Sequence, residues 1–124
     1  MEKYISKSDI SVFDMSKSDI LKKEFARDFR TGLLKLFILK MLDREDMHGY
    51  AMMARIEELS GWKPSPGSIY PSLVNLHSSK LITFRMVKLR KVFSITKKGR
   101  EYIMNLDANF EIGLNEIHRI YKEL

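Results

Sequence analysis

The sequence predicts a mainly α-helical protein with one small β-hairpin. Three observations support this prediction. Apolar residues recur every three to four positions over most of the 124 residues, they alternate with polar residues only around residues 82–96, and helical periodicity then continues to the last residue. With 44% hydrophobic residues, the chain has enough apolar material to form the core of one domain.

The first expected helix covers residues 17–30 and follows a Ser-x-x-Asp start signal at Ser16. Its apolar residues recur at every fourth position: Leu21, Phe25 and Phe29. The start signal also occurs at Ser6, but an offset of ten residues does not preserve a helical face. We therefore expect residues 1–31 to form an N-terminal arm and helix, which Gly32 breaks or bends.

Two helices are expected next. Residues 33–42 are apolar at nearly every position, which is typical of a core helix buried on most sides. After a polar turn, a helix that His48 starts is expected to end at Gly61. The apolar positions of this second helix are Tyr50, Met53, Ala54, Ile56 and Leu59.

The third helix of this region follows a cluster of prolines, serines and glycines, where Ser65 or Gly67 can cap its first turn. Pro71 then falls within the first turn or just past it, where a missing N–H is tolerated. The expected buried positions recur at helical spacing: Ile69, Leu73 and Leu76.

A short hairpin follows, because apolar and polar residues alternate over residues 82–87 and again over residues 93–96. The connection near Lys88, Leu89 and Arg90 contains no Gly, Asn or Asp. A tight two-residue turn needs left-handed backbone conformations that those residues favour, so we expect a looser tip.

The last helix is expected over residues 97–124, with Thr96 as its N-cap and Gly99 in its first turn. An apolar stripe with the a/d spacing of a coiled coil follows: Ile103, Leu106, Phe110, Gly113, Ile117, Ile120 and Leu124. A helix about 42 Å long exceeds what so small a domain can cover. We therefore expect a dimerisation helix, although packing on the chain's own N-terminal helix is the alternative, and Gly113 permits either close approach or a bend.

The charge of the chain is concentrated in one region. Residues 62–100 carry nine basic and no acidic side chains, whereas the whole chain has a net charge of +6, so the remaining residues sum to −3. A solvated surface usually mixes both signs, so this acid-free region favours contact with a polyanion such as nucleic acid.

The order of the elements adds a fold to this charge. A helix after a tight turn, followed by a basic hairpin, is the plan of a winged helix-turn-helix. We expect this domain over residues 32–98, with an N-terminal helical extension before it and the long dimerisation helix, residues 99–124, after it.

Three motifs also resemble one known family. They are His48-Gly49-Tyr50, the run from Gly61 to Leu73, and Arg90-Lys91 followed by Ile95-Thr96 and Gly99. In type, order and spacing they resemble the PadR-like transcriptional regulators, over about residues 32–105. The resemblance implies a dimeric, winged-helix, DNA-binding repressor whose C-terminal helix supplies the dimer contacts.

The sequence departs from the family pattern in two places. The family usually ends its recognition helix with an acidic residue followed by Gly-Leu, whereas this chain has His77, two serines, Lys80 and Leu81. Lys80 thus occupies a position that favours glycine at positive φ. The hairpin is also shorter than the usual wing, which argues against deep contact with the minor groove.

We expect two kinds of DNA contact. Ser68, Ser72 and Asn75 are expected opposite the buried stripe of the third helix, where they can meet base edges, and an Asn can bond adenine through two hydrogen bonds. Contacts to phosphates are expected from the region around the turn and the hairpin: Lys63, Ser65, Arg85, Lys88, Arg90 and Lys91. The hydroxyl of Tyr70 is expected to reach a phosphate while its ring packs on Pro66 or Pro71. A solvated face and a purely structural tyrosine are the alternatives.

Several classes of function are not expected. The chain has no cysteine, its three histidines are far apart, and it has neither a catalytic triad pattern nor a glycine-rich phosphate loop. We therefore expect no enzyme, no metal and no cofactor. Trp62 is expected to pack the turn rather than to stack on a ligand. The first residues lack the apolar segment of a secretory signal and the apolar run at residues 33–42 is about half a membrane span, so we expect a cytoplasmic protein with no membrane partner.

The expected function is that of a sequence-specific regulator of transcription. We expect a homodimer that binds double-stranded DNA at a palindromic operator and acts as a repressor. A sequence-independent architectural nucleic-acid binder and a winged-helix protein–protein interaction module are the alternatives. The sequence leaves open whether a small-molecule effector exists.

Overall fold

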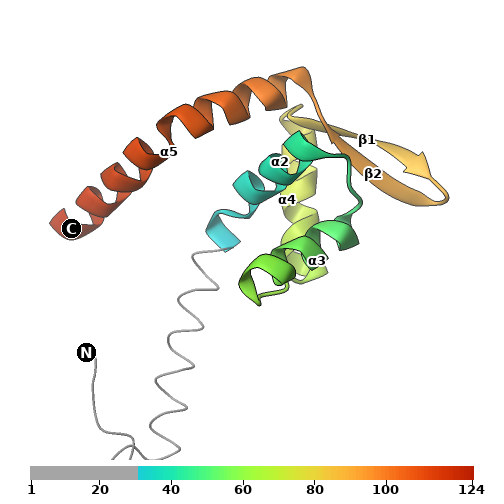
Figure 1. Cartoon of the computed structure of the whole chain (residues 1–124), viewed down its shortest axis with the longest axis horizontal. Helices are drawn as coiled ribbons and strands as arrows, with labels where there is room; N and C mark the ends of the chain where they lie inside the picture. The colour runs from blue at the N-terminus through green and yellow to red at the C-terminus, as the bar shows by residue number, and fades with distance from the viewer. Residues whose placement is uncertain (1–30) are drawn as a thin grey trace, which may run out of the picture. The chain divides into compact units, whose positions relative to one another are not determined.

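The structure, a computed structural model, describes residues 31–124. From Leu34 onward these residues form four helices and one antiparallel two-stranded sheet (Figure 1). In chain order the elements are α2 (Leu34–Arg44), α3 (Gly49–Ser60), α4 (Pro66–Ser78), β1 (Ile82–Val87), β2 (Arg90–Ile95) and α5 (Lys97–Glu123). The predicted class, mainly helical with a small hairpin in a winged-helix arrangement, is confirmed. The helix expected over residues 17–30 lies outside the described residues.

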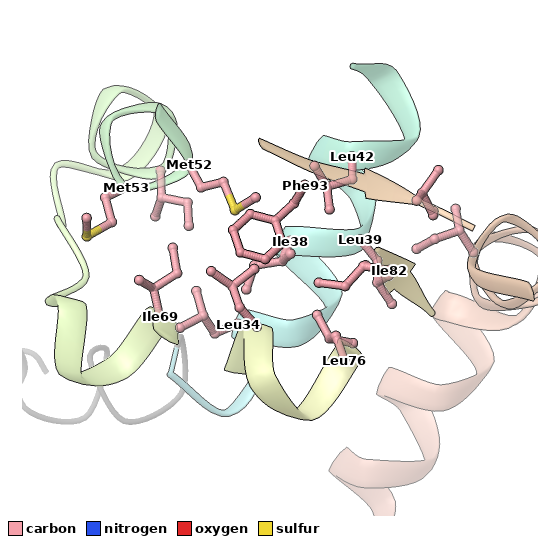
Figure 2. Packing of buried hydrophobic residues seen from close by; sticks show 14 residues of the cluster. Leu34, Ile38, Leu39, Leu42, Met52, Met53, Ile69, Leu76, Ile82 and Phe93 are labelled. Atoms are coloured by element: carbon pink, nitrogen blue, oxygen red, sulfur yellow. The ribbon is translucent and has the colours of Figure 1, made fainter. Parts of the chain in front are cut away.

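Helix α2 forms the centre of the core. It packs against α4, β2 and α5, and its side chains Leu34, Ile38, Leu39 and Leu42 are all buried (Figure 2). Methionines from α3 and isoleucines and leucines from α4 and the hairpin close around them. The expected core helix is therefore present, but its fully buried residues lie along one stripe and Lys35 and Lys40 are exposed, so the expectation of burial on most sides is wrong.

Helix α3 begins and ends where expected but presents a different face. His48 is its N-cap and Gly61, at a φ of 76°, ends it. Met53 and Ile56 are buried as expected, and Met52 is buried with them, whereas the expected positions Tyr50, Ala54 and Leu59 are exposed. Gly49 is buried, which sets the rotation of the helix and turns its neighbour Tyr50 outward.

Ser65 occupies the N-cap position of α4, although its side chain makes no capping hydrogen bond, and the buried residues Ile69, Leu73 and Leu76 are those predicted. Because the helix already begins at Pro66, Pro71 is its sixth residue and lies in the second turn, further along than expected. A proline there has no N–H to donate to the carbonyl of Gly67, so the helix forgoes one of its internal hydrogen bonds.

The end of α4 confirms the expectation for Lys80. The Leu81 N–H donates to the Leu76 carbonyl at 3.0 Å and the Lys80 N–H donates to the His77 carbonyl at 2.9 Å, which is the Schellman pattern. Lys80 has a φ of 62°, the left-handed conformation that this pattern requires and that glycine adopts most easily.

The hairpin tip differs from the prediction. The pairing places Val87 opposite Arg90, so Lys88 and Leu89 alone connect the strands, and both have positive φ, 49° and 66°. This is a tight two-residue turn of the kind that matches the twist of the strands. The register of the strands determines the turn here, although neither residue favours it.

The hairpin is attached to the helices through the other edge of β2. Met47, in the loop between α2 and α3, pairs with Phe93 through two backbone hydrogen bonds of 3.1 and 2.8 Å. This bridge holds the start of α3 beside the hairpin.

Helix α5 begins as expected, because Thr96 caps it by accepting a hydrogen bond from the Gly99 N–H at 3.0 Å. A side chain at Gly99 would put its Cβ 2.2 Å from the Leu81 carbonyl oxygen, so only glycine allows this contact. Beyond Gly99, Ile103 is the one fully buried residue of α5. Figure 1 shows the remaining turns running away from the core. Within residues 31–124, no helix is long and apolar enough to cross a membrane.

Candidate nucleic-acid interface

The exposed face of α4 is the first part of the candidate interface. Asn75 is exposed there, as expected, but Ser68 and Ser72 are half-buried on its flank and Ser72 donates a hydrogen bond to the Ser68 carbonyl. The expectation that all three residues lie opposite the buried stripe is therefore wrong for the two serines. Val74 was not anticipated, yet 66% of it is exposed.

Val74 could have been found from the sequence. It lies outside the helical stripe that Leu73 and Leu76 define, and an apolar β-branched residue outside that stripe has no place in the core. Its exposed methyl groups are of the kind that contact the methyl group of thymine.

Tyr70 lies at the edge of the same face. Its ring packs over Gly49 at the start of α3, since a Cβ on that glycine would be 3.0 Å from the Tyr70 hydroxyl oxygen. The ring was expected to pack on Pro66 or Pro71 instead. A glycine at position 49 leaves the space that the phenol occupies, while the tyrosine itself stays 39% exposed.

Most cations of the acid-free region have no acidic partner within the part of the chain that the structure describes. Asp46 pairs with Arg85 at 2.8 Å and Asp43 pairs with Arg100 at 3.1 Å. Among the described residues the other seven basic side chains form no ion pair: Lys63, Lys80, Lys88, Arg90, Lys91, Lys97 and Lys98. Lys63 and Ser65 are exposed immediately before α4, and Lys88, Arg90 and Lys91 are exposed at the hairpin tip.

Arg85 is held differently from these residues. Its guanidinium donates hydrogen bonds to the Asp46 carboxylate and to the Ser94 hydroxyl. The hydrogen bond from Arg85, with a smaller contribution from Ser94, holds the pKa of Asp46 below its usual range. The positive charge of Arg85 is thus already compensated within the chain.

The two cations of β2 point to opposite faces of the hairpin. Lys91 shares a face with Phe84, and its ammonium lies 4.5 Å from the centre of that ring. Arg90 faces the other way, and its guanidinium lies 3.2 Å from the imidazole of His48.

A hollow of about 280 Å³ lies between the start of α3, Tyr70 and the hairpin tip. We call it the hairpin hollow. Its lining residues are His48, Gly49, Tyr50, Tyr70, Leu89, Arg90, Lys91 and Phe93. The hollow therefore brings together three of the predicted contact residues, Tyr70, Arg90 and Lys91, with His48, which the sequence analysis assigned only to the start of a helix.

Beyond Leu106, which packs partly against the core, no residue of the described range 31–124 covers the apolar stripe of α5. Phe110, Gly113, Ile117, Ile120 and Leu124 are all exposed in the single chain. The helix continues through Gly113 without interruption, and a Cβ at this position would meet nothing within 4 Å.

Trp62 is half-buried and packs against the core, which agrees with a structural role in the turn between α3 and α4. Among residues 31–124 no three potential metal ligands lie together.

Comparison with known proteins identifies the same family that the sequence motifs resemble. The sequence profile described as "Transcriptional regulator PadR-like family" matches residues 38–105, which is more than half of the chain. The chain is also 40% identical over 80 residues to the protein named Transcriptional regulator YqjI of Escherichia coli (strain K12). That match covers 62% of this chain but 39% of the relative, so the chain spans about two fifths of the relative's length.

Solved structures share the fold. A PadR family transcriptional regulator from Eggerthella lenta superposes with a TM-score of 0.68 at 21% identity, over 89% of this chain and 99% of the other. Bacillus subtilis PadR, solved in complex with operator DNA, superposes with a TM-score of 0.53 at 30% identity, over 59% of this chain and 44% of the other.

Proposed function

Since the chain belongs to the PadR-like family of transcriptional regulators, we propose that it binds double-stranded DNA sequence-specifically, as a homodimer, and represses transcription. The observation that carries this proposal is the exposed face of α4, with Val74 and Asn75, bordered by cations that form no ion pair with any acidic side chain of residues 31–124. The Bacillus subtilis neighbour binds operator DNA with the same fold, which supports the same use of the surface here.

In this proposal α4 enters the major groove. Asn75 and Val74 contact base edges. The half-buried Ser68 and Ser72 contact base edges from the flank of the helix. Lys63, Ser65, Tyr70 and the hairpin cations Lys88, Arg90 and Lys91 contact phosphates, which fix the position of the domain on the duplex. Arg85 contributes less, because its charge is shared with Asp46.

The dimer is proposed to form through the stripe of α5. Its exposed apolar side chains need a cover that the described part of the chain does not supply, and Gly113 leaves room for a second helix to approach closely. Two copies related by a two-fold axis would place two α4 helices on two half-sites, so the operator is expected to be palindromic.

Repression follows most simply from occupation of the operator. The surfaces proposed above bind DNA and a second copy of the chain, and none of them is proposed to bind RNA polymerase. The proposal places the protein in the cytoplasm with its DNA, and it assigns no enzymatic activity, metal or cofactor.

The test is to select bound fragments from a pool of random duplexes and to measure affinity for the selected sequence and for a scrambled duplex at the same salt concentration. We expect a palindrome that binds at least about 10³-fold more tightly than the scrambled duplex. Equal affinities would contradict sequence-specific regulation and favour an architectural nucleic-acid binder. Failure to bind either duplex would favour a protein-interaction module.

A further inference from the structure

In the hairpin hollow, His48 makes two contacts that no protonation state of its ring can satisfy together. The His48 ring has two nitrogens, and each faces a different group. Nδ1 lies 3.2 Å from the Ala51 backbone nitrogen and accepts its hydrogen bond, while Nε2 lies 3.2 Å from Nη1 of Arg90.

Arginine only donates hydrogen bonds, and a backbone N–H only donates. Both neighbours of His48 therefore demand an acceptor, but a neutral imidazole has only one nitrogen with a free lone pair. If Nδ1 accepts from Ala51, Nε2 carries a proton that faces the guanidinium. If Nε2 accepts from Arg90, the Nδ1 proton faces the Ala51 N–H instead, and in the doubly protonated ring both contacts are lost.

An oxygen that accepts from both groups removes the conflict. With Nδ1 accepting from Ala51, the Nε2 proton and an Arg90 N–H can both donate to one anionic oxygen. The surroundings favour such a ligand, because none of the described residues that line the hollow is acidic and Tyr70 belongs to the same lining.

We propose that the hairpin hollow is a binding site for a phosphate oxyanion, held by His48 Nε2 and the Arg90 guanidinium. Its identification as a backbone phosphate of DNA rests on the proposed function. His48 then has two tasks, because one nitrogen caps α3 and the other contacts the phosphate. The backbone bridge between Met47 and Phe93 holds the start of α3 beside the hairpin. His48 and Arg90, which lie on these two segments, can therefore contact the same ligand.

A substitution can separate the two tasks. Asparagine caps helices well but does not extend as far as the Nε2 of histidine. His48→Asn is therefore expected to keep the thermal midpoint of the protein and to lose the phosphate contact. Arg90→Ala, at an exposed position, removes the other donor without affecting the cap.

The first experiment uses the full chain and inorganic phosphate, without DNA. Phosphate is titrated at constant ionic strength while the ring resonances of the three histidines are followed by NMR. We expect a saturable shift of His48 in the wild type that disappears in Arg90→Ala, whereas His77 and His118 shift in neither. No shift at His48, or the same shift in Arg90→Ala, would overturn the site whatever the protein does with DNA.

The second experiment places single methylphosphonates, which lack the phosphate charge, along the selected duplex. One position in each half-site is expected to weaken binding by the wild type and to have no effect on His48→Asn or Arg90→Ala. Each variant should bind the unmodified duplex roughly 10- to 100-fold more weakly, as expected for one lost hydrogen bond in each half-site. If the wild type prefers its palindrome while His48→Asn binds it equally tightly, the phosphate site is wrong and the proposed function stands. If the wild type prefers no sequence but His48 shows the saturable phosphate shift, the phosphate site stands and the proposed function is wrong.

Discussion

At the scale of single residues, exposed side chains of α4 and of the hairpin differ in the kind of binding energy that they can supply. A side chain that bonds a base edge contributes sequence preference, whereas a cation that meets a phosphate contributes affinity for any duplex and a dependence on salt. Asn75 belongs to the first kind and Lys91 to the second.

We therefore predict that Asn75→Ala removes a preference of about 1–3 kcal/mol at one base pair in each half-site. The slope of log affinity against log salt should stay nearly unchanged, because no phosphate contact is lost. Lys91→Ala is the control, since it should weaken all duplexes alike and reduce that slope by roughly one per lost contact. Salt titrations on matched and mismatched duplexes measure both. Equal losses on all duplexes for Asn75→Ala would contradict base contact by this residue.

Arg85 gives a prediction about pH. Because its hydrogen bond lowers the pKa of Asp46 in the folded protein, the pair stabilises the fold above the unfolded pKa of an aspartate, about 4, and this contribution is lost as the pH falls through the lower folded pKa. Arg85→Ala should raise the pKa of Asp46 toward its usual value, measured by NMR titration of the carboxyl carbon. The stability lost at neutral pH should be at most about 1 kcal/mol, because both side chains are half exposed.

The same variant distinguishes Arg85 from the free cations. Since Asp46 already compensates its charge, Arg85→Ala should change the salt dependence of DNA binding less than Lys91→Ala does. A larger change would show that the arginine leaves Asp46 to meet a phosphate.

At the scale of elements, the places where sequence reasoning succeeded and failed have a common physical cause. Helix ends follow from local chemistry, so His48, Ser65, Thr96 and Gly61 could be assigned from residue type and spacing. The face that a helix buries depends on its neighbours. The rotation of α3 follows from a buried glycine beneath Tyr70, which lies about twenty positions along the chain, and no pattern within α3 contains that information.

The hairpin tip is a second case. Its residues argue against a tight turn, yet six paired positions on each strand fix the register and leave only two residues to connect the strands. Lys88 and Leu89 therefore adopt left-handed backbone conformations despite the strain, and Leu89 is 95% exposed at the tip. The cations of the candidate site could be predicted from the sequence, but their positions relative to one another and to His48 could not. The position of His48 beside Arg90 depends on the bridge between Met47 and Phe93, which joins segments more than forty residues apart.

Lys80 supplies the prediction at this scale. A side chain in the left-handed conformation is strained, and glycine relieves that strain at some cost in the entropy of the unfolded chain. Lys80→Gly should therefore stabilise the protein by about 0.5–1 kcal/mol. Ser79→Gly, one position earlier at a φ of −80°, is the matched control and should stabilise nothing. Chemical denaturation measures both, and an equal gain from the two glycines would contradict strain at Lys80.

At the scale of the whole molecule, α5 has two parts with different environments. Its first turns are tied to the core by Gly99 and Ile103 and by two ion pairs, from Arg100 to Asp43 and from Lys40 to Asp107. After these the helix carries an apolar stripe with nothing from the described part of the chain over it. The base of the helix thus packs on the core while its outer turns are exposed, which is the arrangement a dimerisation helix requires.

Two isoleucines of α5 test this interpretation with one and the same substitution. Ile117 lies in the a/d stripe and is 58% exposed, whereas Ile112 lies outside the stripe and is 67% exposed. Because neither side chain is buried in the single chain, replacing either by arginine should leave the folded monomer intact. At the centre of an apolar interface, however, two copies of Ile117→Arg would bury unpaired charges. We expect this variant to raise the dimer dissociation constant at least about 100-fold, and to bind DNA weakly because a single half-site supplies half of the contacts. Ile112→Arg should remain a dimer. Sedimentation equilibrium decides between these outcomes: a stable Ile117→Arg dimer, or equal dissociation of both variants, would show that the stripe of α5 does not form the interface.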